Sequence, residues 1–248
     1  MINGINYKDF FEKFKQTEIG KQLTADFDEV TCSNKNPPSI LVVKNKYNTT
    51  CRELLGRNDL SIKKPYTTIS AVSFYYINML LEKNPSIIYD FGCGWNLWKK
   101  YIPIIHGVDN NSDNADEIAD FNRKYISKYY RSIPSAFMIN MDFGIGGENT
   151  TFENIGDHII EFSKIIQSGG RGYFATSGYG LLYFTPDEWF KTHSITRYEH
   201  WKIAEILKQQ ICSLDLDIIS LDIELDVLLN PPGHDGEFRL VFEVRNES

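Results

Sequence analysis

The chain has 248 residues, of which 42% are hydrophobic and 24% charged, and its formal net charge is −7. This composition is that of a globular protein and excludes a disordered one, and the length suits one α/β domain with an additional segment. A general binder of the phosphate backbone needs clustered Lys and Arg, so the acidic balance disfavours nucleic acid as the partner. An acidic chain can still carry a local basic groove.

The cysteines and the chain start give expectations about the compartment. Cys32, Cys51, Cys93 and Cys212 are scattered, with no CxxC pair and no His at ligand spacing. We therefore expect reduced thiols in a cytoplasmic protein and no metal site. The first residues lack the apolar core of a signal peptide, and no apolar run is long enough to span a bilayer. The many Asn, Ile, Lys and Tyr residues are typical of AT-rich genomes, so a phage- or virus-encoded protein in the host cytoplasm also fits.

Residues 1–84 are predicted to form a helical extension packed on the core domain, because no Gly- or Ser-rich linker separates the two. Apolar residues recur at helical spacing between Tyr7 and Leu23 and over residues 66–82. Ser39–Val43 is typical of a short strand between them.

Residues 85–248 alternate between strands and helices, which predicts an α/β domain with a doubly wound, mostly parallel sheet. Gly169-Gly170 is expected to end the third predicted helix in left-handed conformation. Two closing strands should form an antiparallel pair. The predicted strands are 87–89, 104–108, 136–141, 172–176, 216–229 and 238–244; the predicted helices are 97–101, 113–130, 155–166 and 187–211, the last in two pieces.

The strongest motif is Asp90-Phe91-Gly92-Cys93-Gly94 at the end of the first of these strands, followed fifteen residues after Gly94 by Asp109 at the end of the second. Glycines permit positive φ in the sharp turn from strand to helix and let a ligand approach the backbone. An acid at the tip of the next strand can accept both hydroxyls of a ribose. The two elements together predict a nucleoside-containing cofactor across the carboxyl ends of both strands.

Two cofactor families use such a turn. The dinucleotide fingerprint needs a third Gly where this chain has Leu97, which disfavours a nicotinamide-dependent oxidoreductase. From about Ile87 to Val244 the chain resembles the class I S-adenosylmethionine-dependent methyltransferases, which have a Rossmann-like fold. The resemblance implies that Asp90 orients the Gly loop and that Asp109 holds the ribose of S-adenosylmethionine. The cofactor contacts implied are Asp90, Phe91, Gly92, Cys93, Gly94, Asp109, Asn110, Met141 and Asp142.

The place of the predicted strand 136–141 is open, because the family has two strands where only this one is clear. If it is the third strand, Asp142 should lie near the adenine. If it is the fourth, Asn140, Met141 and Asp142 should face the methyl group and the substrate, and one strand has been lost.

Three classes of substrate chemistry find little support in the sequence. Asn36-Pro37-Pro38 and Asn230-Pro231-Pro232 do not follow the fourth strand, where amino-directed nucleic-acid methyltransferases carry such a motif. Lys63 or Lys64, Asp142 and Glu243 could supply part of the Lys-Asp-Lys-Glu set of ribose 2′-O-methyltransferases, but its second Lys is missing after the Gly-Gly strand. No Cys is placed for attack on a pyrimidine ring.

Residues 177–198 should lie over the carboxyl edge of the sheet, where ligands bind in such folds. Tyr179, Tyr183, Trp189 and His193 could form an aromatic lid there or supply a general base. We therefore favour a methyltransferase whose acceptor is a small or polar molecule. A membrane is not expected as a partner, and nucleic acid is disfavoured. The alternatives are a catalytically degenerate scaffold of the same fold and, less favoured, a nucleic-acid methyltransferase.

Overall fold

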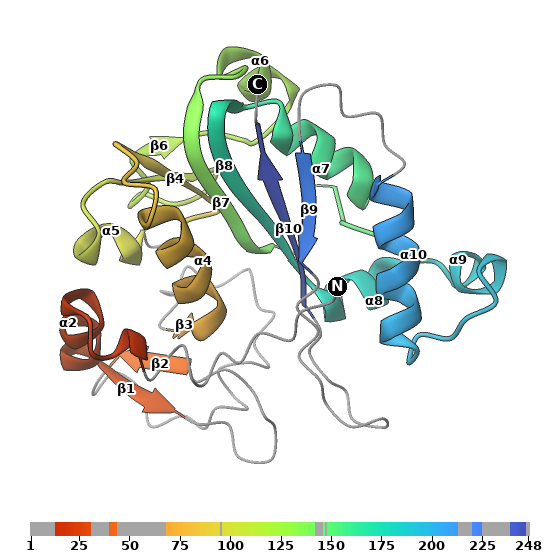
Figure 1. The fold of residues 1–248 in the computed structure, drawn as a ribbon, viewed down its shortest axis with the longest axis horizontal. Coiled ribbons are helices and arrows are strands. Elements are labelled where there is room, and N and C mark those ends of the chain that lie inside the picture. The colour runs from red at the N-terminus through yellow and green to blue at the C-terminus, as the bar shows by residue number, and fades with distance from the viewer. Residues whose placement is uncertain are drawn as a thin grey trace.

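A computed structural model of the chain describes residues 13–30, 40–43, 68–94, 96–141, 146, 148–212, 220–224 and 239–246. A seven-stranded sheet forms the body of this part of the molecule (Figure 1). A three-stranded antiparallel sheet from the N-terminal region lies beside it.

The large sheet has the order β6-β5-β4-β7-β8-β10-β9. Its strands are β4 (Ile88–Phe91), β5 (Ile105–Asp109), β6 (Glu117–Ile118), β7 (Ile133–Met141), β8 (Ile166–Ser177), β9 (Ser220–Glu224) and β10 (Arg239–Arg245). The first five in this order are parallel, and β10 is antiparallel to both β8 and β9. The predicted α/β class, the mostly parallel sheet and the closing antiparallel pair are confirmed.

Helices enclose the sheet because its strands alternate between two apolar faces. Phe137 and Tyr173 point to a cluster with α4, whereas Met138 and Phe174 point to one with α7 and α10. The helices of this domain are α4 (Ala71–Leu81), α5 (Leu97–Tyr101), α6 (Arg123–Lys128), α7 (Ile155–Ser163), α8 (Gly178–Phe184), α9 (Asp187–Thr192) and α10 (His200–Cys212). The expected two pieces over 187–211 are α9 and α10.

The predicted strand 136–141 belongs to β7, which lies on the far side of β4 from β5 and is therefore the fourth strand. The third strand is not lost but is reduced to the two residues of β6. The predicted helix over 113–130 is wrong in its first half for this reason. Its second half is α6, which begins only after Asn122, whose side chain accepts hydrogen bonds from the backbone N–H groups of Lys124 and Tyr125 at 3.0 and 3.1 Å.

The expected glycine cap of the third helix is also wrong. Helix α7 ends at Ser163, and Gly169 lies inside β8 with a φ of 72°. The register between β7 and β8 shifts between the pairs Ile133–Ile166 and Ser135–Arg171. Gly169 thus forms a bulge that lets a twelve-residue strand bend, which is another use of positive φ.

The N-terminal region contains more strand than predicted. Helix α2 (Glu18–Asp26) is followed by β1 (Phe27–Val30), β2 (Ile40–Val43) and β3 (Thr68–Ser70). The strand expected at 39–43 is β2, whereas part of the expected helix over 66–82 is β3. Phe14 and Leu23 pack in the same cluster as α4 and the sheet. The domain boundary at residue 84 stays a prediction.

Several predicted features lie outside the described residues: the segment around Lys63 and Lys64, both Asn-Pro-Pro turns, and Asp142. In the part of the chain that the structure describes, no helix is long and apolar enough to cross a membrane.

Candidate functional site

The turn after β4 is built on three left-handed residues. Gly92, Gly94 and Asn96 have φ values of 75°, 53° and 52°. Glycine adopts this conformation without strain, and asparagine tolerates it better than most residues. The backbone N–H groups of Gly92 and Cys93 both donate to the carbonyl of Val108, at 2.8 and 3.2 Å. The loop is thereby held against the end of β5.

Asp109 closes the loop from the neighbouring strand. One carboxylate oxygen, Oδ2, accepts the N–H of Gly94 at 3.0 Å, and the other, Oδ1, accepts the N–H of Asn111 at 2.9 Å. Asp109 is only half-buried and Asn110 is exposed. Since a carboxylate oxygen accepts more than one hydrogen bond, both can still receive ligand hydroxyls.

Asp90 lies behind the loop and is 5% exposed. Burial and, to a smaller extent, the negative charge of Asp109 together raise the pKa of its carboxyl to about 8. Asp90 therefore holds its proton at neutral pH, and as a protonated acid it can donate a hydrogen bond as well as accept one.

Cys93, between the two glycines, is a free and half-buried thiol. Burial raises its pKa, and so do the charges of Asp90 and Asp109. The nucleophilic form of cysteine is the thiolate, so Cys93 is unreactive at neutral pH.

A second acid, Asp116, fixes the same loop and was not found from the sequence. Its carboxylate accepts the N–H of Gly107 at 2.8 Å and the side-chain amide of Asn96 at 3.0 Å, and it pairs with Lys99. Burial raises the pKa of Asp116, but these hydrogen bonds outweigh it and hold the pKa at about 2. In the sequence, only Asn96, two residues after Gly94, could have indicated this network. Asp116 reaches the loop because the connection from β5 to β6 is short.

Gly107 allows this arrangement by having no side chain. A Cβ there would lie 2.6 Å from Cγ of Asn96 and 2.7 Å from Sγ of Cys93, far closer than real contacts. The side chain of Asn96 lies across the strand at this point and is 8% exposed. Ser112 adds a hydrogen bond from its hydroxyl to the carbonyl of Gly94.

Two further predicted contacts are only partly described. The ring of Phe91 is buried and packs on Phe121 at 4.6 Å between ring centroids, so only its backbone is left for a ligand. Met141 ends β7, where it pairs with Thr176 of β8. Asp142, which follows it, lies outside the described residues.

The aromatic residues expected over the sheet edge are divided. Tyr183 of α8 is 72% exposed, whereas Trp189 of α9 is 5% exposed and packs between Phe152 and His193. Both ring nitrogens of His193 have partners: Nδ1 meets the carbonyl of Trp189 at 2.7 Å and Nε2 meets the amide of Gln210 at 3.3 Å. Trp189 and His193 line a pocket of about 350 Å³ beside the start of α7. These are packing contacts, and they leave His193 no free nitrogen for a general base.

Glu243 does not take the role considered for it in a ribose methyltransferase. It is 1% exposed on β10, opposite Tyr173, and its carboxylate pairs with Arg171 and, at 2.6 Å, with Arg245. The carboxyl end of β8 lies at the other end of this pairing, where Ser177 meets Arg239. Glu243 therefore lies away from the edge that carries the Gly loop.

The order of the strands decides the fold. Counted along the chain, the large sheet runs third, second, first, fourth, fifth, seventh and sixth, with the seventh strand antiparallel to both of its neighbours. This chain has the Rossmann-like fold of the class I methyltransferases. In that fold the loop after the first strand and the acid at the end of the second, here Gly92–Gly94 and Asp109, are neighbours at the carboxyl edge.

The solved structures to which this chain is similar include methyltransferases. A S-adenosylmethionine-dependent methyltransferase from Archaeoglobus fulgidus has 10% identity and a TM-score of 0.41, over 71% of this chain and 92% of that one. A methyltransferase of Podospora anserina, solved with S-adenosylhomocysteine, has 10% identity and a TM-score of 0.39, over 79% and 86%. An rRNA methylase from Streptococcus thermophilus has 12% identity and a TM-score of 0.38, over 75% and 99%.

No family model and no curated protein matches the sequence. Identities and TM-scores as low as those of the solved structures transfer no substrate and no partner. The methyltransferase fold is assigned from the strand order of this chain.

Proposed function

We propose that this protein binds S-adenosylmethionine at the carboxyl edge of β4 and β5 and transfers its methyl group to a small or polar acceptor. The observation that carries the proposal is the contact between the Asp109 carboxylate and the N–H of Gly94, at 3.0 Å. It places an acid with remaining acceptor capacity directly beside a glycine turn, and this pairing suits a ribose next to a backbone approached closely by the ligand.

The residues present fit this cofactor. Gly92 and Gly94 offer a turn without Cβ atoms, Asp109 offers both carboxylate oxygens to the ribose hydroxyls, and Asn110 lies exposed beside it. Phe91 and Cys93 can contribute through their backbone, and Met141 and Asp142 from the end of β7. Asp90 and Asp116 would support the loop from behind. S-adenosylmethionine supplies a methyl group on a sulfonium, and the protein's share of such a displacement is chiefly to align donor and acceptor.

The acceptor class rests on the overall charge and on the chemistry of the site. A net charge of −7 does not favour a polymeric anion at the catalytic edge. The thiol of Cys93 is buried, and both ring nitrogens of His193 have partners, so neither side chain is suited to remove a proton from the acceptor. An acceptor that needs alignment rather than a strong base fits best.

Calorimetry tests the cofactor first. S-adenosylmethionine and S-adenosylhomocysteine should both bind, and NAD should not. Absence of binding by the first two would overturn the proposal, and tighter binding of NAD would favour an oxidoreductase.

Activity is tested next, by release of S-adenosylhomocysteine in the presence of mixed small amines, alcohols and carboxylic acids. Acceptor-dependent release supports a methyltransferase. Cofactor binding without release from any mixture would favour the degenerate scaffold of the same fold.

A further inference from the structure

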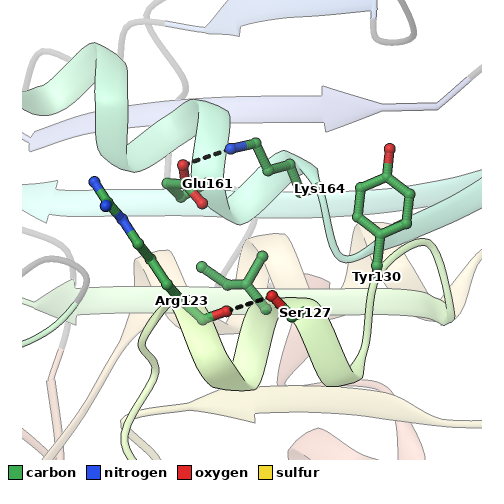
Figure 2. Close-up of a pocket in the computed structure, with 6 residues that line it drawn as sticks. Arg123, Ser127, Tyr130, Glu161 and Lys164 are labelled. Atoms are coloured by element: carbon green, nitrogen blue, oxygen red, sulfur yellow. Dashed lines mark hydrogen bonds and ion pairs between the residues drawn. The ribbon is translucent and has the colours of Figure 1, made fainter.

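A groove between α6 and α7 has a volume of about 600 Å³ and lies away from the Gly loop. Figure 2 shows Arg123, Ser127 and Tyr130 rising from α6 and the segment after it, with Glu161 and Lys164 facing them from α7. The groove lies near the start of β7 and β8, since Arg131 donates to the carbonyl of Lys164 and Ser132 to that of Ile165. It is therefore remote from the carboxyl edge of the sheet.

The charge of this region is opposite to that of the whole chain. Residues 121–141 contain no Asp or Glu, although the formal net charge of the chain is −7. The cations here are Arg123, Lys124, Lys128 and Arg131, and Lys164 adds a fifth from α7.

Among the described residues, two of these cations have no ion-pair partner. Lys164 is paired with Glu161 at 2.5 Å and Lys128 with Glu117 at 3.2 Å. Among the described residues, the side chains of Arg123 and Lys124 form no ion pair, and both are exposed. Arg123 projects along the rim of the groove (Figure 2), free to contact an anion.

An aromatic ring lies within the same surface. Tyr130 is 53% exposed, and the guanidinium of Arg131 lies 5.4 Å from the centre of its ring. Arg123 and Ser127 are four residues apart on α6 and so share one face of the helix, and Tyr130, just after the end of α6, lines the same groove. Cations that alternate with an exposed ring match a chain of phosphates with stackable bases.

We propose that the α6–α7 groove binds single-stranded nucleic acid, with phosphates on Arg123 and Lys124 and a base stacked on Tyr130. Phosphate contacts need free cations rather than cations already paired, and Arg123 and Lys124 meet that condition. Glu161 remains as an acceptor for base amino groups. This surface is independent of the proposed cofactor site, and it is the local basic groove that an acidic chain can still carry.

Fluorescence anisotropy with labelled single-stranded oligonucleotides of about 12 nucleotides tests the proposal, since a groove of this kind covers about 4–16 nucleotides. Binding to oligo(U) and oligo(dT) should weaken between about 50 and 200 mM salt. The double variant Arg123→Ala/Lys124→Ala should lower the slope of log K against log salt by about 1.4, because each phosphate contact on a single strand contributes about 0.7.

The aromatic contact has its own test. Tyr130→Ala should weaken binding at least about fivefold, whereas Tyr130→Phe should keep it, because stacking needs the ring and not the hydroxyl. Lys191→Ala is the control: it removes an exposed cation of α9 that does not line the groove, and it should change nothing.

Three results would overturn the proposal: no binding at about 50 mM salt, an equal loss with Lys191→Ala, or displacement of the oligonucleotide by polyglutamate as readily as by unlabelled RNA. The last would assign the groove to acidic proteins instead. Calorimetry of the Arg123→Ala/Lys124→Ala variant separates the two proposals, since it should bind S-adenosylmethionine as the unmodified chain does.

Discussion

Asp90 and Glu243 carry buried carboxyl groups in one sheet, and these residues are 5% and 1% exposed, yet their surroundings are opposite. Glu243 lies between Arg171 and Arg245 and joins β8 to its neighbour β10. Among the described residues Asp90 has no ion pair, and the charge acting on its pKa is another acid, Asp109. A buried acid that two arginines neutralise holds two strands together, whereas a buried acid placed beside a second acid is typical of a site that binds a ligand.

The Gly loop after β4 and the β8–β10 pair show the same contrast. Around Gly94 the carboxylates of Asp109 and Asp116 accept hydrogen bonds from backbone N–H groups, and the glycines and Asn96 have left-handed conformations. At the β8–β10 pair the bonds join side chain to side chain: Glu243 of β10 pairs with Arg171 of β8 across the antiparallel register and with Arg245 of its own strand. Variants of the two regions should therefore separate loss of stability from loss of cofactor binding.

The largest loss of stability by substitution is expected at the Glu243 pair. Glu243→Ala leaves Arg171, whose side chain is 11% exposed, without its counter-charge. We expect a loss of about 3 kcal/mol in the free energy of unfolding, at the lower end for a broken buried pair because Arg245 is 38% exposed. Urea denaturation measures it. Glu188→Ala, from an exposed pair on α9, should change stability by less than about 0.5 kcal/mol.

Glu243→Ala should also leave the affinity for S-adenosylmethionine unchanged below the unfolding transition. A selective loss of cofactor binding in this variant would contradict the separation between the two regions.

The next effect concerns Asp109. Asp109→Ala removes the acceptor of Gly94 N–H and of the proposed ribose hydroxyls, so calorimetry should show S-adenosylmethionine binding at least about 100-fold weaker, as expected for two hydrogen bonds to a charged group. Asp113→Ala, an exposed acid in the same connection, is the control. Equal affinity of Asp109→Ala and the unmodified chain would mean that the ribose does not lie at the tip of β5.

Gly107→Ala probes how tightly the loop is packed. Its Cβ would meet Asn96 and Cys93 at 2.6 and 2.7 Å, so we expect a loss of about 1–3 kcal/mol in stability together with weaker cofactor binding. Adding Cys93→Ala removes one of the two contacts and should restore part of the stability, which a double-mutant cycle measures. Purely additive losses would show that the strand, not the loop, absorbs the new methyl group.

The sequence was sufficient where one short pattern determined local geometry. Apolar runs ending at Asp90 and Asp109 predicted β4 and β5, and the glycines between them predicted the turn, because these signals depend on neighbouring residues alone. The two-residue β6 escaped prediction because its connection from β5 is too short to hold a helix. Gly169 was assigned to a helix cap because positive φ serves equally in caps and in bulges, and only the register between β7 and β8 distinguishes them.

The networks of the site were harder still to predict. Asp116 and Gly107 lie next to Asn96 only after the chain has folded across β5, so no spacing identified them. The basic surface of α6 could not be predicted from the net charge of −7, because a net charge does not say where the Lys and Arg residues lie on the folded protein. Trp189 and His193 were expected at the sheet edge because they follow β8, yet apolar packing against Phe152 takes them to the start of α7.

Asp90 is expected to make the stability depend on pH, and the sign of that dependence tests the comparison directly. With a pKa near 8 in the folded state, above its ordinary value of 3.8, Asp90 keeps a proton that the unfolded chain loses between about pH 4 and 8. The stability of the unmodified chain therefore falls as the pH rises through this window. Asp90→Asn, which imitates the protonated acid, removes that loss, so its advantage should grow with pH by up to about 1.4 kcal/mol per unit and level off above pH 8.

Urea denaturation of both proteins across this window measures the difference. In an Asp109→Asn background the pH range over which the two stabilities diverge should be narrower, because the charge of Asp109 is gone and only burial still raises the pKa of Asp90. A difference that does not change with pH would mean that Asp90 is ionised in the folded protein. It would then need a cation as Glu243 does, and the contrast between a structural acid and one kept for a ligand would fail.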